Sequence, residues 1–174
     1  MKLSEVKTGR AFKIGEMQFI KFLGNGNMTV VVARDIAFNS VYGENNNFSQ
    51  SEISERLNKE ILPKIEKEIG KENILEFETD LTSLDGLKTY GTMKSRISIP
   101  TFDFYRNNIE IFDMHKLDCY WWLATPDTTK EHGSDRWNVC VSPNGNFYSD
   151  DYNGYDGVRP FLNLVSSISV SCEE

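Results

Sequence analysis

The sequence predicts an α+β fold in one domain, with strands near both ends of its 174 residues and helices between them. Three patterns carry this prediction: apolar runs around a Gly-Asn turn near the start, apolar residues at every fourth position in the middle, and short strand-like segments in the last third. We divide the chain into a β-meander (1–48), a helical and mixed segment (49–118) and a tryptophan-rich sheet with long loops (119–174).

Residues 10–34 are predicted to form the meander. Phe12 and Ile14 alternate with polar or small residues, and a mostly apolar run follows. Gly24-Asn25-Gly26-Asn27 has the residue types of a tight hairpin turn, and a second apolar run resumes after it.

A surface helix is predicted next. Ser49 and Glu52 have the spacing of a capping box. Ile53, Leu57 and Ile61 recur at the interval that places them on one buried helical face.

Proline and glycine residues divide the rest of the middle segment. Pro63 interrupts the helix and opens a second short one, which Gly70 ends. The charges of 64–71 alternate in sign, as on a solvated face. Thr82 resembles a further helix start, and Thr101 is expected to cap another short helix.

The last third reads as strands and polar loops. Residues 120–124 are apolar throughout, as in a central strand, and 137–141 with 147–148 form a predicted hairpin. Residues 149–157 contain no aliphatic side chain and are predicted to be a surface loop. The final strand, 158–164, contains a proline that indicates an edge or a bulge.

The charge balance excludes some partners. The net charge is -7, and residues 119–174 hold three basic and eight acidic residues, so the field repels phosphate backbones and anionic lipids. We therefore expect no direct nucleic-acid binding and no membrane binding. No apolar run approaches the roughly 18 residues that span a bilayer, and no secretory signal is visible, so a cytoplasmic location, or one in a phage particle, is predicted.

Four residues of the last third are assigned structural roles: Trp121, Trp122, Trp137 and Arg159. Adjacent tryptophans on a strand face opposite ways, so at least one lies in the core, and the third begins an alternating strand and is expected to be buried. The arginine, beside a proline, is expected to form an ion pair with Asp127 or Asp156. The odd number of cysteines favours reduced thiols, with a Cys119–Cys140 disulfide as the minor alternative.

The candidate ligand-binding residues are polar and tyrosine residues of the C-terminal loops: Asn138, Asn144, Asn146, Tyr148, Asp150, Asp151, Tyr152, Asn153, Tyr155 and Asp156. Tyrosine with asparagine, serine and glycine is typical of adaptable recognition loops, because tyrosine supplies contact area with few rotatable bonds. These positions are therefore the main functional hypothesis.

Catalytic chemistry finds little support. Neither histidine stands in a recognisable arrangement with serine or cysteine, so no catalytic residue and no cofactor is assigned. Two metal hypotheses are kept as minor alternatives to solvated loops. One is calcium at Asp150, Asp151, Asn153 and Asp156, and the other is a site at His132 with Glu131 and Asp135.

Three segments resemble an uncharacterised domain family of Gram-positive bacteria and their phages, whose members read WWLRSP, then V-x-x-x-G, then GVRPAL. The matching segments here are YWWLATP (120–126), VCVSPNG (139–145) and GVRPFLNL (157–164), with Ala124-Thr125 in place of the usual Arg-Ser pair. The family is similar to the C-type-lectin-like fold, to which formylglycine-generating enzymes also belong. The resemblance implies a small sheet with a binding face made of long loops. It does not carry over the enzymes' cysteine chemistry, because Cys140 lies on a strand and Cys119 precedes another.

Together these observations predict a non-enzymatic recognition module of phage or prophage origin that binds a protein or a glycan through loops 127–136 and 144–157. Two alternatives stay open. The first is an acidic, anti-CRISPR-like inhibitor of a host defence protein, whose binding would weaken with salt. The second is an enzyme whose active site the sequence does not reveal.

Overall fold

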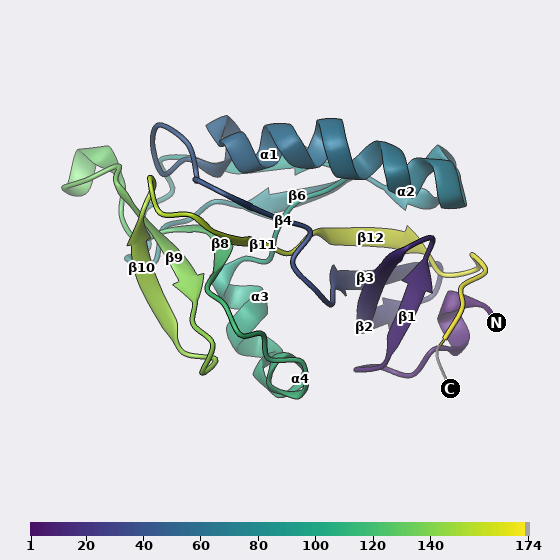
Figure 1. Ribbon diagram of the computed structural model, residues 1–174. Coiled ribbons are helices and arrows are strands. Elements are labelled where there is room, and N and C mark those ends of the chain that lie inside the picture. The colour runs from purple at the N-terminus through teal and green to yellow at the C-terminus, as the bar shows by residue number, and fades with distance from the viewer. Residues whose placement is uncertain (173–174) are drawn as a thin grey trace.

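The computed structural model describes residues 1–172 and is a mixed α+β fold, as the sequence predicts (Figure 1). The helices are α1 (Glu52–Arg56), α2 (Leu62–Ile69), α3 (Phe102–Asn107) and α4 (Ile109–Met114), and a π-helical turn, Leu57–Ile61, joins α1 to α2. Short 3-10 turns occupy Leu3–Glu5, Phe48–Gln50, Lys71–Asn73 and Lys130–His132. In the described part of the chain, no helix has the length and apolar character needed to cross a bilayer.

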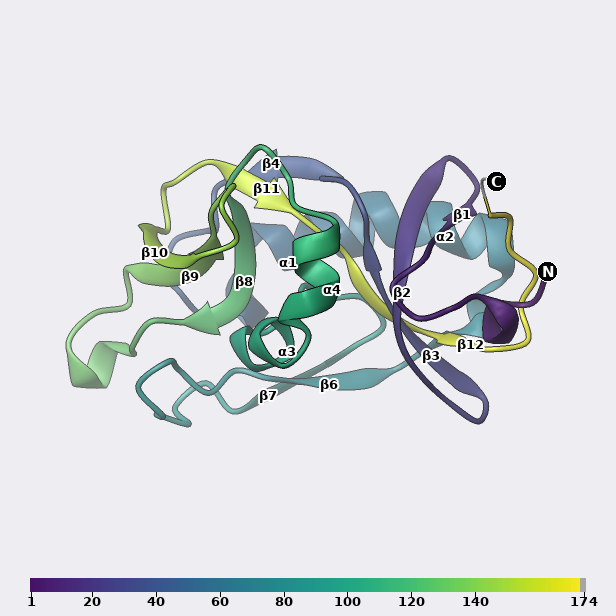
Figure 2. The ribbon, with the colours of Figure 1, turned by 90° about the horizontal axis from the view of Figure 1, so that it is seen from below.

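The strands form two five-stranded sheets and one two-stranded sheet, which lie apart in Figure 2. The N-terminal sheet has the order β1-β2-β3-β12-β5, and its strands are β1 (Ala11–Ile14), β2 (Met17–Asn25), β3 (Met28–Ala33), β12 (Phe161–Val165) and β5 (Ile74–Leu75). The C-terminal sheet has the order β10-β9-β8-β11-β4, and its strands are β10 (Phe147–Asp151), β9 (Trp137–Val141), β8 (Trp121–Pro126), β11 (Asp156–Val158) and β4 (Phe38–Ser40). The small sheet pairs β6 (Phe77–Asp80) with β7 (Thr92–Ser95).

The predicted meander is confirmed. Strands β1, β2 and β3 pair antiparallel, and Asn25 pairs with Met28 across a two-residue turn. Gly26 takes a φ of 50° in this turn, a left-handed conformation that favours glycine.

The tryptophan strand is central, as predicted. All six residues of β8 are buried, with β9 on one side and β11 on the other. Trp121 and Trp122 point to opposite faces, and each lies in a different hydrophobic cluster. This sheet therefore separates two apolar layers.

The final segment is two strands rather than one. β11 belongs to the C-terminal sheet and β12 to the N-terminal sheet, with Arg159 and Pro160 between them. Pro160 has no N–H to continue a ladder, and its carbonyl accepts a hydrogen bond from the N–H of Ala33 at 2.8 Å. The expected edge or bulge is thus a crossing between sheets, and β12 is an inner strand.

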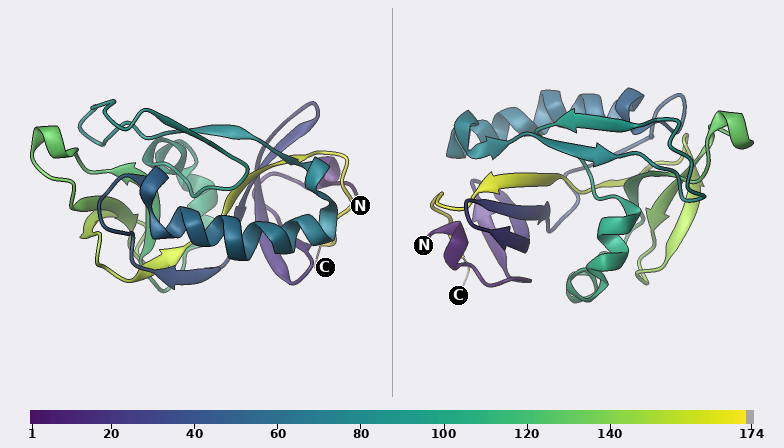
Figure 3. Two further views of the ribbon diagram at one scale, coloured as in Figure 1. Left: turned by 90° about the horizontal axis from the view of Figure 1, so that it is seen from above. Right: turned by 180° about the vertical axis from the view of Figure 1, so that it is seen from behind.

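The helical prediction holds with one correction. The buried face is the expected one, and α1 and α2 run as an almost continuous rod (Figure 3). Ser51, not Ser49, caps α1, because its Oγ accepts the N–H of Ser54 at 3.0 Å. Pro63 opens α2, and Gly70 ends it at a φ of 86°.

Between the helices and the C-terminal sheet, one predicted helix start is wrong and one is confirmed. Thr82 lies in a turn, where its N–H donates to the Asp80 carboxylate at 2.9 Å. Thr101 caps α3 by accepting the N–H of Phe104 at 3.1 Å.

Candidate functional site

Two carboxyl groups lie close together at the C-terminal sheet. Asp150 lies on β10, and Asp156 opens β11 after a tight turn. Burial, followed by the hydrogen bond and the charge of Asp150, raises the pKa of Asp156 to about 7. Two like charges this close do not ionise together readily, so the two groups, which we call the acid pair, hold a proton between them below neutral pH.

The turn between β10 and β11 positions Asp150. The N–H of Gly154 donates to the carbonyl of Asp151 at 2.7 Å, which folds the turn over the Asp150 side chain. A side chain at Gly154 would collide with the Asp150 carboxylate. The Oδ1 atom of Asp150 also accepts the N–H of Asp151 at 2.8 Å, which fixes the rotamer of the carboxylate.

Asn138 lies directly opposite Asp150 on β9, so both side chains share one face of the sheet. Asn138 is fully buried, and neither its Oδ1 nor its Nδ2 has a hydrogen-bond partner among residues 1–172. The Oδ2 atom of Asp156 is likewise buried without a partner. Each such atom costs about 1–3 kcal/mol, a loss that is recovered when a ligand or water supplies the missing bonds.

A thiol lies next to the acid pair but is not reactive. Cys140 is two residues beyond Asn138 on the same face of β9. Burial, and then the charges of Asp156 and Asp150, raise the pKa of Cys140 to about 12. The thiol is therefore neutral and unsuited to nucleophilic chemistry, and all three cysteines are free rather than paired.

Tyrosine rings border the acid pair. Tyr148 shares the face of Asp150 on β10, and its ring meets that of Tyr120 edge to face at 6.1 Å. Both rings are about half exposed, and Tyr155, in the turn before Asp156, is 71% exposed. This surface offers aromatic faces next to carboxyl oxygens, as ligand cations prefer.

Trp137 does not lie in the core, contrary to the prediction. It is 40% exposed, because it begins β9 opposite Asp151 at the end of the sheet.

Arg159 is buried, as its structural role requires, but the predicted ion pair is wrong. Its Nε donates to the Ala33 carbonyl at 3.0 Å and its terminal nitrogen to the Arg34 carbonyl at 3.1 Å. Its guanidinium also lies over the ring of Trp121, 4.7 Å from the centroid. No carboxylate of residues 1–172 pairs with it, and burial lowers its pKa to about 10.

The structure separates the predicted binding residues into three groups. Asn138, Tyr148, Asp150 and Asp156 come together at the acid pair. Asn144 and Asn146 lie at the far end of the β9–β10 hairpin, where the Tyr105 hydroxyl donates to the Gly145 carbonyl. Asp151, the last residue of β10, and Tyr152, Asn153 and Tyr155, in the turn after it, form the third group; Arg136 pairs with Asp151 and lies over the Tyr152 ring.

A residue that sequence reasoning missed anchors the loop 127–136. The Asp85 carboxylate accepts a hydrogen bond from the Thr128 hydroxyl at 2.7 Å, and it lies 2.9 Å from Nδ1 of His132. Hydrogen bonds from Ser83 and Thr128 lower the pKa of Asp85 to about 2. His132 therefore contacts Asp85 rather than Glu131 or Asp135, and among residues 1–172 no three His, Cys, Asp or Glu side chains form a metal-binding group.

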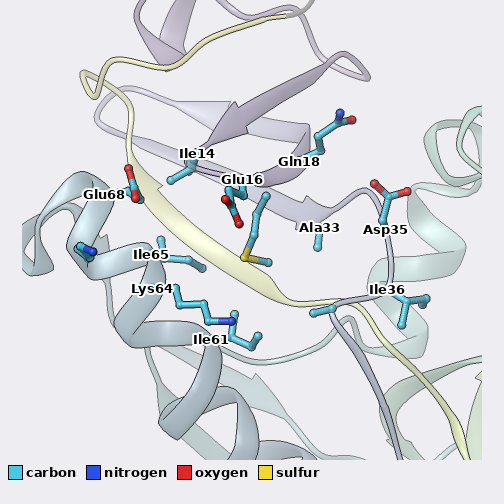
Figure 4. Close-up of a pocket in the computed structure, with 13 residues that line it drawn as sticks. Ile14, Glu16, Gln18, Ala33, Asp35, Ile36, Ile61, Lys64, Ile65 and Glu68 are labelled. Atoms are coloured by element: carbon cyan, nitrogen blue, oxygen red, sulfur yellow. The ribbon is translucent and has the colours of Figure 1, made fainter.

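A separate hollow of about 610 Å³ lies between the β1–β2 hairpin and α2 (Figure 4). Its lining includes the apolar side chains of Ile14, Ile61 and Ile65 and charged side chains of both signs, among them Glu16, Lys64 and Glu68. None of the buried unpartnered polar atoms of residues 1–172 belongs to its lining. The hollow thus lacks the unmet hydrogen-bonding capacity found at the acid pair.

Comparisons of the chain with protein-family models, with curated proteins and with solved structures find no match. The fold and the site define an α+β protein of two five-stranded sheets and one two-stranded sheet, with an acidic, tyrosine-bordered surface at the end of one of the larger sheets. The motif resemblance of the last third stays a prediction.

We expect the acid pair to make stability depend on pH. The pKa of Asp156 is about 7 in the folded protein against an ordinary value of 3.8, so its contribution is complete below pH 4 and is lost as the pH rises to about 7. Solvent screens this charge, so the loss is on the order of 1 kcal/mol, or roughly 2–4 °C in Tm. Thermal unfolding at pH 5 and pH 8 should show that Asp156→Asn removes this difference, whereas the exposed control Asp103→Asn keeps it. Equal pH dependence in Asp156→Asn and wild type would contradict the shared proton.

Proposed function

We propose that this protein is a non-enzymatic recognition module of phage or prophage origin that binds a basic segment of a partner protein at the acid pair. The observation that carries the proposal is Asn138, buried with both polar atoms unpartnered beside two carboxyls that share a proton. A chain selected for stability alone would have an apolar residue there, since an apolar replacement removes the penalty.

The chemistry of the acid pair favours a cationic ligand. A lysine ammonium or arginine guanidinium would take the place of the shared proton, allow both carboxyls to ionise, and donate to the unpartnered oxygens of Asn138 and Asp156. The rings of Tyr120 and Tyr148 would add cation–π attraction. The excess of acidic residues in the last third would accelerate the approach of a basic partner.

The fold assignment belongs to the same proposal. We propose a C-type-lectin-like relationship, and the pairing of the tryptophan strand β8 with β11 in the C-terminal sheet supports it. The long loop 127–136 and the turn 152–155, both at the end of this sheet, support a recognition role for that end. The phage or prophage origin rests on the motif resemblance alone.

Two other outcomes have support of their own. The exposed rings of Tyr120, Trp137, Tyr148 and Tyr155 favour a glycan, whose stacking on aromatic side chains would be nearly indifferent to salt. If the basic partner is a host defence protein, the same acidic surface would make this chain its inhibitor.

A panel of immobilised peptides tests the proposal. We expect the protein to bind peptides rich in lysine and arginine and not counterparts with glutamine in their place. Asp156→Asn should weaken binding by about tenfold and reduce its salt dependence, because one of the two carboxylates is lost. Asn138→Leu should weaken binding while raising the unfolding free energy by about 1–2 kcal/mol, because it removes the unpartnered amide.

Glu72→Gln is the matched control, since it removes one exposed negative charge at the far end of the helical rod. It should bind as the wild type does. Binding to a glycan panel that persists at high salt, without binding to basic peptides, would refute the cationic ligand.

A further inference from the structure

One edge of the C-terminal sheet is the strand β10, at one end of the sheet order, and the other edge is β4 (Figure 1). The N–H of Ser142 bonds the carbonyl of Asn146 at 2.8 Å, and the N–H of Tyr152 bonds that of Arg136 at 2.9 Å. Hydrogen-bonded pairs alternate along an antiparallel ladder, so Tyr148 and Asp150 direct their backbone groups towards β9.

The intervening residues are Phe147, Ser149 and Asp151. Their backbone N–H and C=O groups point away from β9, outward at the open edge of the sheet. The N–H of Asp151 is occupied by the Asp150 carboxylate. Within residues 1–172, no other element donates to or accepts from the backbone of Phe147 or Ser149. A free edge with exposed backbone groups is a template for another strand, and proteins usually cover or blunt it.

We propose that the partner binds by adding an extended strand to β10, with basic residues alternating with apolar ones. This inference rests on the proposed function and specifies its mode. In an added strand, the residues that share the face of Tyr148 and Asp150 would reach the acid pair, because directly opposite side chains lie about 5 Å apart. The residues on the other face would pack on Phe147, which is 51% exposed.

Charge argues for such a partner rather than for a second copy of the chain. Two β10 strands paired antiparallel would place both acid pairs, and the acidic residue Asp151 of each copy, along one seam. Like charges across a sheet are destabilising, whereas a lysine-bearing strand meets the carboxylates with the opposite sign. The free edge of β10 and the acid pair therefore both favour an extended strand that carries basic residues.

A labelled synthetic peptide that alternates lysine and valine is the probe, with binding followed by fluorescence anisotropy. Ser149→Pro removes only an outward N–H and is compatible with an edge strand, so it should weaken binding by at least about tenfold. Ser149→Ala, the matched control, keeps that N–H and should bind within roughly twofold of wild type. Unchanged thermal unfolding of Ser149→Pro would establish that its own ladder is intact.

The outcomes separate the two proposals. If Asp156→Asn weakens binding and Ser149→Pro does not, strand addition is wrong and the cationic ligand stands; if neither variant weakens it, both are wrong. Should Ser149→Pro fail to fold, a peptide N-methylated at the residues facing β10 gives the same test on the wild type, and equal affinity would overturn the inference. A dimer in sedimentation that Ser149→Pro dissociates would also overturn it, because a second copy would then occupy the edge.

Discussion

Replacing Arg159 with alanine is expected to lower the free energy of unfolding by about 3–5 kcal/mol, the range for deleting a large buried side chain. Arg159 is 1% exposed and lies between the two sheets, over the rings of Trp121 and Phe112. Its loss would open a cavity there and leave the carbonyls of Ala33 and Arg34 without their donors. Urea unfolding of the variant measures the change directly.

Two further variants define the cause. Arg159→Lys retains the charge, but an ammonium group cannot stack on the aromatic rings as a planar guanidinium does, nor reach both carbonyls. We therefore expect it to lower the free energy of unfolding by about half as much as Arg159→Ala. Arg106→Ala, an exposed arginine paired with Asp103, should change stability by less than about 0.5 kcal/mol. A loss below about 1 kcal/mol in Arg159→Ala would show that the junction between the sheets does not depend on this residue.

Trp122→Ala should cost a similar amount, about 3–5 kcal/mol. Trp122 is fully buried at the centre of the C-terminal sheet, its ring meets that of Tyr42 at 5.2 Å, and its Nε1–H donates to the Ser40 carbonyl at 2.9 Å. That carbonyl belongs to β4, so the tryptophan ties the outer strand to the centre of the sheet. Calorimetric unfolding should give a lower Tm together with a lower unfolding enthalpy.

Trp122→Phe keeps most of the ring and removes the donor, so we expect it to lose about 1–3 kcal/mol. The comparison tryptophan is Trp137, which is 40% exposed and should lose less than about 1 kcal/mol when changed to alanine. If Trp137→Ala were as costly as Trp122→Ala, the difference in burial would not explain the effect.

Local patterns were sufficient for most of the elements. The Gly-Asn turn, the i, i+4, i+8 stripe of Ile53, Leu57 and Ile61, and the apolar run of β8 each reflect interactions within a few residues. The observed cap of α1 is Ser51, two residues after the predicted Ser49. The two serines are chemically equivalent as caps, and the conformation of the neighbouring backbone selects between them.

The sequence predicts which residue types belong to the candidate site, but not which of these residues lie together. Sequence reasoning named ten loop residues, and strand register brings four of them together while leaving Asn144 and Asn146 at the opposite end of the hairpin. Nothing local distinguishes Asp150 from Asp151, yet Asp150 lies close enough to Asp156 to raise its pKa, whereas Asp151 pairs with Arg136. Strand alternation turns adjacent carboxylates to opposite faces, and this depends on register.

Long-range contacts decided the features that matter most for function. The periodicity of residues 158–164 indicates a strand, but the division of this segment between two sheets depends on β3 and β4, which lie more than a hundred residues earlier in the chain. The hydrogen bonds of Arg159 also depend on distant residues, because its acceptors are the backbone carbonyls of Ala33 and Arg34, which no sequence motif identifies. Side-chain periods and turn residues act over a few positions, whereas burial, proton sharing and free edges arise where distant segments meet.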